Sequence, residues 1–538
     1  MVYPSLHNKS NITSFRTIAE SAFYTNNVQE VESVAEAYFL AEQSPGTIVT
    51  DIPIYEPEFH DLPSDSRVLV FNDGAVIGRC AQARRIAFTP DVDKKRYDEV
   101  LREAVYGTRF RKMYHAQSVI GLHPDFMVNA HLLIPEGFEN IMLSWLLNFQ
   151  TINTKYREMY ENSKPIEDFE IFILSNPYWQ HPDFPLGLAF FDPAHNIAIL
   201  LGLRYFGEHK KCTLTLSWGT ANRHGYASCH GGLKRYDDNK KVYAFFGLSG
   251  SGKSTLTHAK HGGKYNTTIL HDDAFIINVS DSSSIALEPS YFDKTADYEI
   301  GHPDNKFILT AQNVGISIGE DDEMYIVTED IRNGNGRAVK SRLWSPNRTD
   351  KIEDPISAIF WLMKDPAIPP ILKIEDPILA STMGTTLATK RTSAERVVGV
   401  SLDKLVVEPY ANPFRTYPLI DDYTKFKSFF ERNVECYILN TGEFMGKDIP
   451  KEITIGILES LIENKAEFVS LKGLPQFSYI PIEGFVPDMD DKKYKDFFRK
   501  RMEDRLEYIE NREEATKDFD TLPDEAADAI KAVIAGFA

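Results

Sequence analysis

The sequence predicts a mixed α/β protein of two domains, and three observations support this fold class. Apolar runs of strand length, such as residues 67–71, 170–174 and 196–201, alternate with helical patterns such as residues 98–105. The chain has 538 residues, which is more than one ordinary hydrophobic core supports. A glycine-rich segment follows an apolar stretch at residues 241–248 and precedes a helical pattern, in the strand–loop–helix order of a phosphate loop. A cleft between the two domains is therefore the expected place for a site.

The composition of the chain limits the kinds of molecule that it is expected to bind and the compartment in which it is expected to occur. The chain has 59 Lys and Arg against 78 Asp and Glu, so its formal charge of -19 disfavours nucleic acid and anionic membrane surfaces. The four cysteines lack zinc-cluster spacing and are too few for a disulfide framework, which indicates free thiols and a cytoplasmic location. No window reaches the roughly 18 apolar residues of a membrane span, and the N-terminus lacks an export signal.

Two segments of the C-terminal half have distinctive composition. Residues 365–395 are rich in Pro and then in Thr, Ser and Gly, with little periodicity, so they predict a long loop. Residues 488–514 are densely charged, with apolar residues at helical spacing, and predict a surface helix whose charges form a solvated face.

The strongest motif is the glycine-rich loop, which matches the pattern GxxxxGK[ST]. It consists of Gly247, Leu248, Ser249, Gly250, Ser251, Gly252, Lys253, Ser254 and the following Thr255. Glycines let backbone N–H groups converge on phosphate oxygens, a lysine neutralises phosphate charge, and the serine hydroxyl binds Mg²⁺. This pattern predicts a bound nucleotide, but it leaves the reaction open.

A second motif follows at residues 269–273, where two apolar residues and a histidine lead into Asp272 and Asp273. Alone, such an acidic pair is more often a turn or the start of a helix. After a phosphate loop it predicts a strand that delivers carboxylates to a metal ion beside the phosphates.

These motifs resemble those of ATP-dependent phosphoenolpyruvate carboxykinases. The family's phosphate loop FFGLSGxGK[ST]T is similar to residues 245–255, and its Leu-Ile-Gly-Asp-Asp strand to residues 269–273. Its Tyr-x-Gly-Glu-x-Lys-Lys resembles residues 205–211, and its Gly-Ile-Ala-Ser-x-His resembles residues 225–230. Weaker matches lie at Ile77-Gly-Arg79, Ser341-Arg-Leu-Trp-Ser-Pro346, Glu408-Pro409 and Asn440-Thr-Gly442.

The resemblance implies a two-domain carboxykinase architecture with the site in the interdomain cleft. Residues 1–235 are then the substrate-binding domain, and residues 236–538 are the nucleotide-binding domain that carries the phosphate loop. Residues 365–395 fall where the family has a mobile lid that excludes water. The charged helix lies in the C-terminal tail.

The resemblance also implies an activity, namely the reversible conversion of oxaloacetate and ATP into phosphoenolpyruvate and CO₂, in gluconeogenesis or anaplerosis. The implied metal ions are Mg²⁺ on the nucleotide, held by Ser254, and Mn²⁺, held by Lys211, His230 and Asp273. Without the resemblance, Lys210 and Lys211 would be interpreted as an exposed basic pair and His230 as a packed histidine.

The remaining implied roles concern substrate and phosphate. Arg79 grips the substrate carboxylate, Tyr205 faces the reacting carbon, and Arg342 bridges substrate and γ-phosphate, with Arg337 as its rival in sequence. Lys210 and Lys253 are also implied to be catalytic, and Asp272 to contact the nucleotide.

Several positions depart from the family pattern. Residues 80–84 read Cys-Ala-Gln-Ala-Arg, Ala274-Phe275 follows the acidic pair, and Gly-Gly follows His230. Asp448 stands where the family has an arginine that helps to hold the nucleotide, and an acid there repels phosphate. The sequence therefore leaves open a kinase of the same fold with another acceptor, or a non-catalytic nucleotide-binding protein. It also leaves open the nucleotide, the direction of reaction and the oligomeric state.

Overall fold

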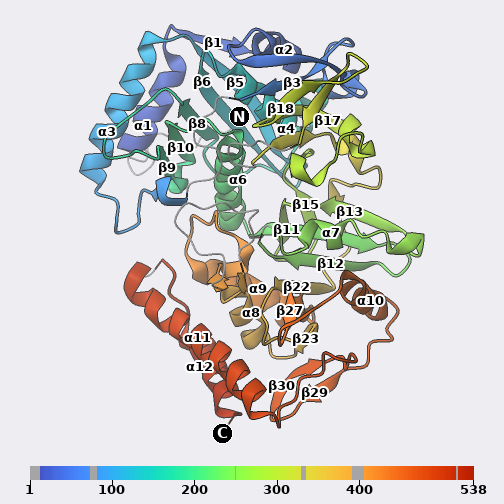
Figure 1. Cartoon of the computed structure of the whole chain (residues 1–538). Coiled ribbons are helices and arrows are strands. Elements are labelled where there is room, and N and C mark those ends of the chain that lie inside the picture. Colours follow the sequence, from blue (N-terminus) through green and yellow to red (C-terminus); the bar gives the residue numbers. More distant parts are fainter. Residues whose placement is uncertain are drawn as a thin grey trace. The chain divides into compact units, whose positions relative to one another are not determined.

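The structure is a computed structural model, and it describes residues 13–72, 81–248, 250–328, 335–390, 405–516 and 519–537. These residues contain twelve α-helices together with several β-sheets, so the predicted mixed α/β class is confirmed (Figure 1).

The chain forms two compact units that interleave along the sequence. Unit 1 comprises Met1–Thr220 and Leu287–Pro346, and unit 2 comprises Ala221–Ala286 and Asn347–Ala538. The expected division had one boundary, at residues 235/236, whereas here the chain returns to unit 1 after a first pass through unit 2. The assignment of substrate binding and nucleotide binding to separate domains stays a prediction.

The larger sheet of unit 1 has the strand order β1–β5–β6–β8–β10–β9–β4, and β7 pairs with β5. Its strands are β1 (Val28–Val31), β4 (Arg84–Ile86), β5 (Met113–His123), β6 (Phe126–Pro135), β7 (Gln150–Thr151), β8 (Ile171–Asn176), β9 (Leu188–Asp192) and β10 (Ile197–Leu201). Strands β8, β9 and β10 are buried along their whole length, which explains why they read as continuous apolar runs.

Helices complete the core of unit 1. The helices are α1 (Ser14–Ser21), α2 (Val34–Glu42), α3 (Lys94–Gly107), α4 (Glu139–Asn148), α5 (Thr154–Glu161) and α6 (Phe206–Arg223), which continues into unit 2. Phe15 of α1 and Leu101 of α3 pack with Phe190 and Ile199 of the sheet in one buried cluster. The helix predicted at residues 98–105 is therefore confirmed within α3.

A smaller sheet of unit 1 joins segments that are far apart in sequence. Its order is β16–β20–β17–β3–β2, with β2 (Thr47–Pro53), β3 (Arg67–Phe71), β16 (Tyr291–Lys294), β17 (Ile308–Gln312) and β20 (Arg337–Lys340). Strand β17 runs parallel to β3, with Thr310 opposite Leu69, so the yellow and blue segments lie side by side in Figure 1. A separate hairpin pairs β18 (Gly315–Ile318) with β19 (Met324–Val327).

Unit 2 is built on one mixed sheet, of order β21–β15–β14–β11–β12–β22–β26–β23–β30–β29, with β13 paired to β11. Its strands are β11 (Tyr226–Tyr236), β12 (Lys241–Phe246), β13 (Thr267–His271), β14 (Ala274–Asn278), β15 (Ser284–Ala286), β21 (Lys351–Ile352), β22 (Ala358–Met363), β23 (Ile371–Ile374), β26 (Glu435–Asn440), β29 (Val469–Leu471) and β30 (Leu474–Tyr479).

Helices cover both faces of this sheet. They are α7 (Lys253–Thr257), α8 (Pro377–Thr385), α9 (Leu419–Glu431), α10 (Lys451–Ile462), α11 (Lys492–Thr516) and α12 (Asp524–Ala535). On one face, Phe245 and Phe360 pack with Leu256 of α7 and Leu458 of α10. On the other face, Trp361 packs against Phe426 of α9 with ring centroids 5.5 Å apart.

The loop predicted over residues 365–395 holds for residues 365–370 and is wrong for residues 371–390. Residues 371–390 form strand β23, helix α8 and strand β24 (Ala388–Lys390), which pairs with β25 (Leu405–Val407). Helix α8 (Pro377–Thr385) is N-capped by Asp376, whose side chain accepts a hydrogen bond from the Leu379 amide. All of its residues from Leu379 onward are buried, so no polar face was present to reveal helical periodicity. The lid role stays a prediction, and residues 391–395 lie outside the described residues.

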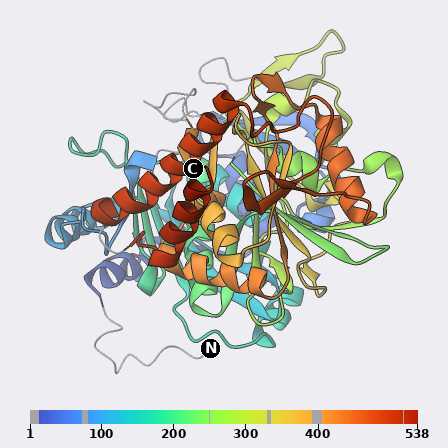
Figure 2. The same ribbon diagram turned by 90° about the horizontal axis from the view of Figure 1, so that it is seen from below.

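The charged tail does form the predicted helix, α11, which lies beside α12 (Figure 2). Tyr494, Phe498 and Met502 of α11 are buried. One charge departs from the expected solvated face, because Arg505 is only 2% exposed. Its Nη2 lies 3.6 Å from a carboxylate oxygen of buried Asp365, so burial of both charges is accompanied by pairing.

Cys212, Cys229 and Cys436 are buried free thiols, and Cys80 lies outside the described residues. In the part of the chain that the structure describes, none of the helices combines the length and the apolar character needed to cross a bilayer.

Candidate active site

The glycine-rich loop lies between strand β12, which ends at Phe246, and helix α7, which begins at Lys253. Gly250 and Gly252 have φ of 77° and 90°, in the left-handed region where a side chain is disfavoured. The helix ends at Thr257 and is shorter than the sequence pattern indicates. Ser249 lies outside the described residues.

Close packing fixes this loop from inside unit 2. A Cβ on Gly247 would lie 2.3 Å from the Ser251 Oγ and 2.8 Å from the Leu362 Cβ, so only glycine fits there. The Thr441 hydroxyl donates a hydrogen bond of 2.7 Å to the Ser251 carbonyl. Thr441 belongs to the predicted Asn440-Thr-Gly442 motif. Through this hydrogen bond, the motif holds the glycine-rich loop in place.

His230, in the middle of one strand, meets Asp273, which lies between two strands that pair with it. His230 lies on β11, opposite Ala274 of the antiparallel strand β14, and Asp273 lies between β13 and β14. The His230 Nε2 is 3.0 Å from the Asp273 Oδ1. A strand, β13 (Thr267–His271), therefore directly precedes the acidic pair, as the sequence predicted.

The hydrogen bond at the other ring nitrogen of His230 bears on metal binding. The His230 Nδ1 lies 2.6 Å from the Ala411 carbonyl oxygen, which can only accept, so Nδ1 carries a proton. In the neutral ring, Nε2 is then an acceptor that faces the Asp273 carboxylate, which is also an acceptor. Because two acceptors repel each other at this distance, a proton or a cation must lie between Nε2 and the carboxylate. Histidine ligands of metals characteristically donate their second N–H to such a carbonyl.

The chemistry of these two donors also suits a divalent ion. Imidazole nitrogen and carboxylate oxygen are common ligands of Mn²⁺ and Zn²⁺ in proteins. His230 and Asp273 therefore fit a divalent metal as donors. The described residues contain no cluster of three His, Cys, Asp or Glu side chains with metal-ligand geometry, so a further ligand would have to be another residue type or water.

Lys253 and the second carboxylate complete the described group in unit 2. The Lys253 Nζ lies 3.8 Å from the Asp273 Oδ1. Asp272 is buried and accepts a side-chain hydrogen bond from Ser254, and its Oδ2 is 3.5 Å from the His258 Nε2. Burial opposes ionisation of Asp272, but these interactions and the nearby imidazoles outweigh it and hold its pKa well below the usual range. Asp272 is thus an anion at neutral pH.

Sequence reasoning missed several residues of this group. His258 lies four residues after Ser254, at the C-cap of α7, and the i, i+4 spacing was the available signal. Ala411 acts through its carbonyl, which no side-chain pattern reveals. The φ of Ala411 is 53° and that of Tyr410 is 51°, both in the left-handed region. This backbone conformation places the Ala411 carbonyl within hydrogen-bond distance of His230.

Lys234 holds the far end of α7. Its Nζ donates hydrogen bonds to the carbonyls of Leu256 at 2.7 Å and Ala259 at 3.5 Å. Burial lowers the pKa of Lys234 to about 7, because a buried ammonium loses its hydration. His261 lies 3.4 Å from the same Nζ, and burial followed by the charge of Lys234 lowers its pKa as well.

The other predicted site residues belong to unit 1. Tyr205 is buried immediately before helix α6, and a Cβ on Gly207 would lie 2.3 Å from its ring. Lys210 is 1% exposed, so the alternative of an exposed basic pair is wrong for it, and it forms an ion pair of 3.0 Å with buried Glu288. Lys211 is half-buried, with its Nζ 5.9 Å from the Trp218 ring.

The arginines are placed less fully. Arg79 lies outside the described residues. Arg342 begins a short 3-10 turn, and its charge contributes to lowering the pKa of His60 to about 4, after the larger effect of burial. Arg337 lies on β20 and donates to the Gly336 carbonyl at 3.0 Å. The choice between Arg342 and Arg337 stays a prediction, as do the roles of all these residues.

A sequence model of the phosphoenolpyruvate carboxykinase family matches residues 69–491. The chain belongs to the ATP-dependent phosphoenolpyruvate carboxykinase family. The resemblance inferred from the motifs is thereby confirmed.

Two curated relatives of this carboxykinase-family chain carry the same name, phosphoenolpyruvate carboxykinase (ATP). The protein from Aeropyrum pernix is 28% identical over 298 residues, which is 51% of this chain and 57% of the relative. The protein from Dictyostelium discoideum is 24% identical over 165 residues, which is 31% of this chain and 28% of the relative. The match thus spans about half of the first relative's length and about a quarter of the second's.

Proposed function

We propose that this chain is a phosphoenolpyruvate carboxykinase that converts oxaloacetate and a nucleoside triphosphate, ATP in the first instance, into phosphoenolpyruvate and CO₂. The observation that carries the proposal is the grouping of His230, Asp273 and Lys253 beside the glycine-rich loop. Family membership supports the same reaction class.

The reaction concentrates negative charge, because decarboxylation leaves an enolate that must accept a phosphoryl group. In the proposal, Lys253 neutralises phosphate charge and the backbone of Gly247 to Gly252 surrounds the phosphates. His230 and Asp273, with Lys211, hold a divalent ion such as Mn²⁺, and Ser254 with Asp272 holds the Mg²⁺ of the nucleotide. When bound, these ions supply charge neutralisation at the phosphoryl and enolate oxygens.

The substrate side of the proposal rests on unit 1. Arg79 and Arg342 bind the carboxylate and the migrating phosphate, and Tyr205 packs against the reacting carbon. The ion pair between Lys210 and Glu288 supports a positioning role for Lys210 within α6, since a lysine held by a buried carboxylate keeps α6 in register.

The test is an assay of oxaloacetate-dependent CO₂ release with ATP, GTP or inosine triphosphate, in the presence of Mg²⁺ and Mn²⁺. Lys253→Ala is expected to lower kcat at least about a hundredfold, because it removes a cation aimed at developing charge. Lys260→Ala, a matched substitution at an exposed lysine seven positions further on, should leave the rate unchanged.

A second pair of variants tests the metal assignment. His230→Gln and Asp273→Asn should each raise the Mn²⁺ concentration for half-maximal activity about 10- to 100-fold, whereas His224→Gln should not. No turnover with any of the three nucleotides would refute the carboxykinase proposal. Nucleotide hydrolysis without oxaloacetate turnover would favour a kinase with another acceptor, and binding alone would favour a non-catalytic protein.

A further inference from the structure

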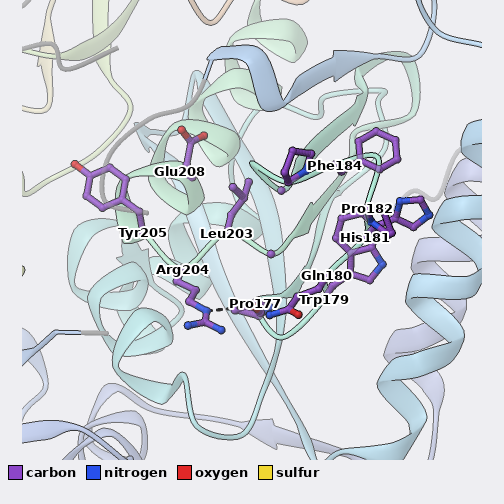
Figure 3. Close-up of a pocket in the computed structure, with 13 residues that line it drawn as sticks. Pro177, Trp179, Gln180, His181, Pro182, Phe184, Leu203, Arg204, Tyr205 and Glu208 are labelled. Atoms are coloured by element: carbon purple, nitrogen blue, oxygen red, sulfur yellow. Dashed lines mark hydrogen bonds between the residues drawn. The ribbon is translucent and has the colours of Figure 1, made fainter. Parts of the chain in front are cut away.

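Unit 1 contains a cavity of about 540 Å³, and Tyr205 is the one residue of its lining to which a role has been assigned above (Figure 3). It lies between the segment that joins β8 to β9 and the segment that joins β10 to α6, so every lining residue belongs to unit 1. This volume falls within the range of about 300–1,000 Å³ that is typical of small-molecule sites.

One wall of the cavity is aromatic. The rings of Trp179 and His181 are stacked, with centroids 5.5 Å apart and an interplanar angle of 17°. Phe184 lies against both, at 5.8 Å from the Trp179 ring and 5.3 Å from the His181 ring. In Figure 3 these three side chains gather on one side of the cavity. A wall of this kind offers flat apolar surface to a planar ligand.

The aromatic wall is preorganised by its own backbone. The Asp183 amide donates to the His181 Nδ1 at 3.1 Å, and the Phe184 amide donates to the His181 carbonyl at 3.0 Å. The Trp179 amide donates to the Asn176 carbonyl at 3.1 Å, at the end of β8. A ligand that binds here therefore needs to order little of the protein, which favours affinity.

The opposite wall carries a cation. Arg204 is half-buried and lines the cavity with Tyr205 and Glu208, as Figure 3 shows. Its Nε donates to the Pro177 carbonyl at 3.3 Å. Among the residues that the structure describes, no carboxylate lies within ion-pair distance of this guanidinium, so most of its five donors remain for a ligand. A planar guanidinium in this state favours a carboxylate, which it can bind through two hydrogen bonds.

We propose that this cavity binds a small aromatic carboxylate, with the ring against Trp179 and Phe184 and the carboxylate on Arg204. Glu208 is 2% exposed and lines the same cavity beside Tyr205. The cavity shares Tyr205 with the proposed substrate site, but the argument rests on the aromatic wall and on Arg204 and does not depend on the proposed function.

The test uses 2-naphthoate as the probe and 2-naphthalenemethanol as its neutral counterpart, with binding to the full chain measured by calorimetry and by tryptophan fluorescence. Wild-type protein should bind naphthoate about 10- to 100-fold more tightly than the alcohol, because a charge-assisted hydrogen bond contributes more than a neutral one. Arg204→Gln should bind naphthoate as weakly as wild type binds the alcohol, and Arg204→Lys should be intermediate.

Arg109→Gln is the matched control, because Arg109 is an exposed guanidinium over the Tyr106 ring and lies outside the cavity. Thermal unfolding of each variant checks its folding; if Arg204→Gln fails to fold, the comparison of the two probes on wild-type protein still decides. Equal binding of the two probes, no binding of naphthoate at millimolar concentration, or an equal effect of Arg109→Gln would overturn the proposal. Displacement of naphthoate by oxaloacetate would assign the cavity to the substrate site and also overturn it.

Discussion

Replacement of Lys234 by methionine should change how the stability of unit 2 depends on pH. Burial lowers the pKa of Lys234 to about 7 in the folded chain, against 10.5 for the ordinary group. Between these values the folded state binds fewer protons than the unfolded state, so the free energy of unfolding rises with pH. The contribution of neutral Lys234 to the free energy of unfolding is fully present above pH 10.5 and is lost as the pH falls toward 7.

The magnitude follows from the two pKa values. Integrating the difference in bound protons from pH 7 to pH 9 gives a gain of about 2 kcal/mol in the free energy of unfolding of the wild-type chain. Lys234→Met removes this titration while keeping an unbranched side chain in the buried site. The variant should therefore lose about 2 kcal/mol relative to wild type on going from pH 7 to pH 9, whatever its stability at pH 7.

Urea unfolding followed by circular dichroism at pH 7, 8 and 9 measures this difference. Lys264→Met is the matched control, because Lys264 is largely exposed and pairs with Glu463 at 2.5 Å. The control should keep the wild-type slope between pH 7 and pH 9. If Lys234→Met and wild type show the same slope, Lys234 is charged in the folded state and the reasoning from burial is refuted.

Three further substitutions test packing and buried charge elsewhere. Gly121→Ala should destabilise unit 1 by at least about 2 kcal/mol in urea unfolding, because its φ is 93° and the new Cβ would lie 2.2 Å from the Phe126 carbonyl oxygen. Burial lowers the pKa of His209 to about 4, so folding stability should fall by about 2 kcal/mol from pH 7 to pH 5, and His209→Leu should remove that loss. Burial raises the pKa of Asp422 to about 7, so its neutral form is favoured and stability should fall by about 3 kcal/mol from pH 5 to pH 8; Asp422→Asn should flatten that profile in thermal unfolding.

Sequence analysis correctly identified the strands that are mostly apolar and the helices that bury one face. Strands β3, β8 and β10 are apolar runs, and α3 and α11 have one buried stripe, so residue type alone indicates their structure. Helix α8 was missed because it is buried on all sides. At Gly384 a Cβ would lie 2.6 Å from the Tyr410 ring and 2.7 Å from the Trp361 ring, so small residues there serve close packing and gave the appearance of a loop.

The candidate site shows the same division. Resemblance to the family motifs pointed to His230, Asp273 and Lys253, and the structure brings their side chains together within unit 2, while their roles stay predictions. The Ala411 carbonyl and the Lys234 ammonium could not be found in this way. Each depends on a contact between segments far apart in sequence, and neither belongs to a local pattern.

The pairing of β3 with β17 has a consequence for synthesis of the chain. Strand β3 leaves the ribosome early, but its parallel neighbour is encoded after the first pass through unit 2. At translation rates of about 5–20 residues per second, β3 waits roughly ten to fifty seconds with the backbone groups of one edge unpaired. An open edge is a template for wrong pairing with other chains, so the nascent protein should depend on chaperones until residues 308–312 emerge. A fragment that ends at Thr220 would keep that edge open permanently and should aggregate.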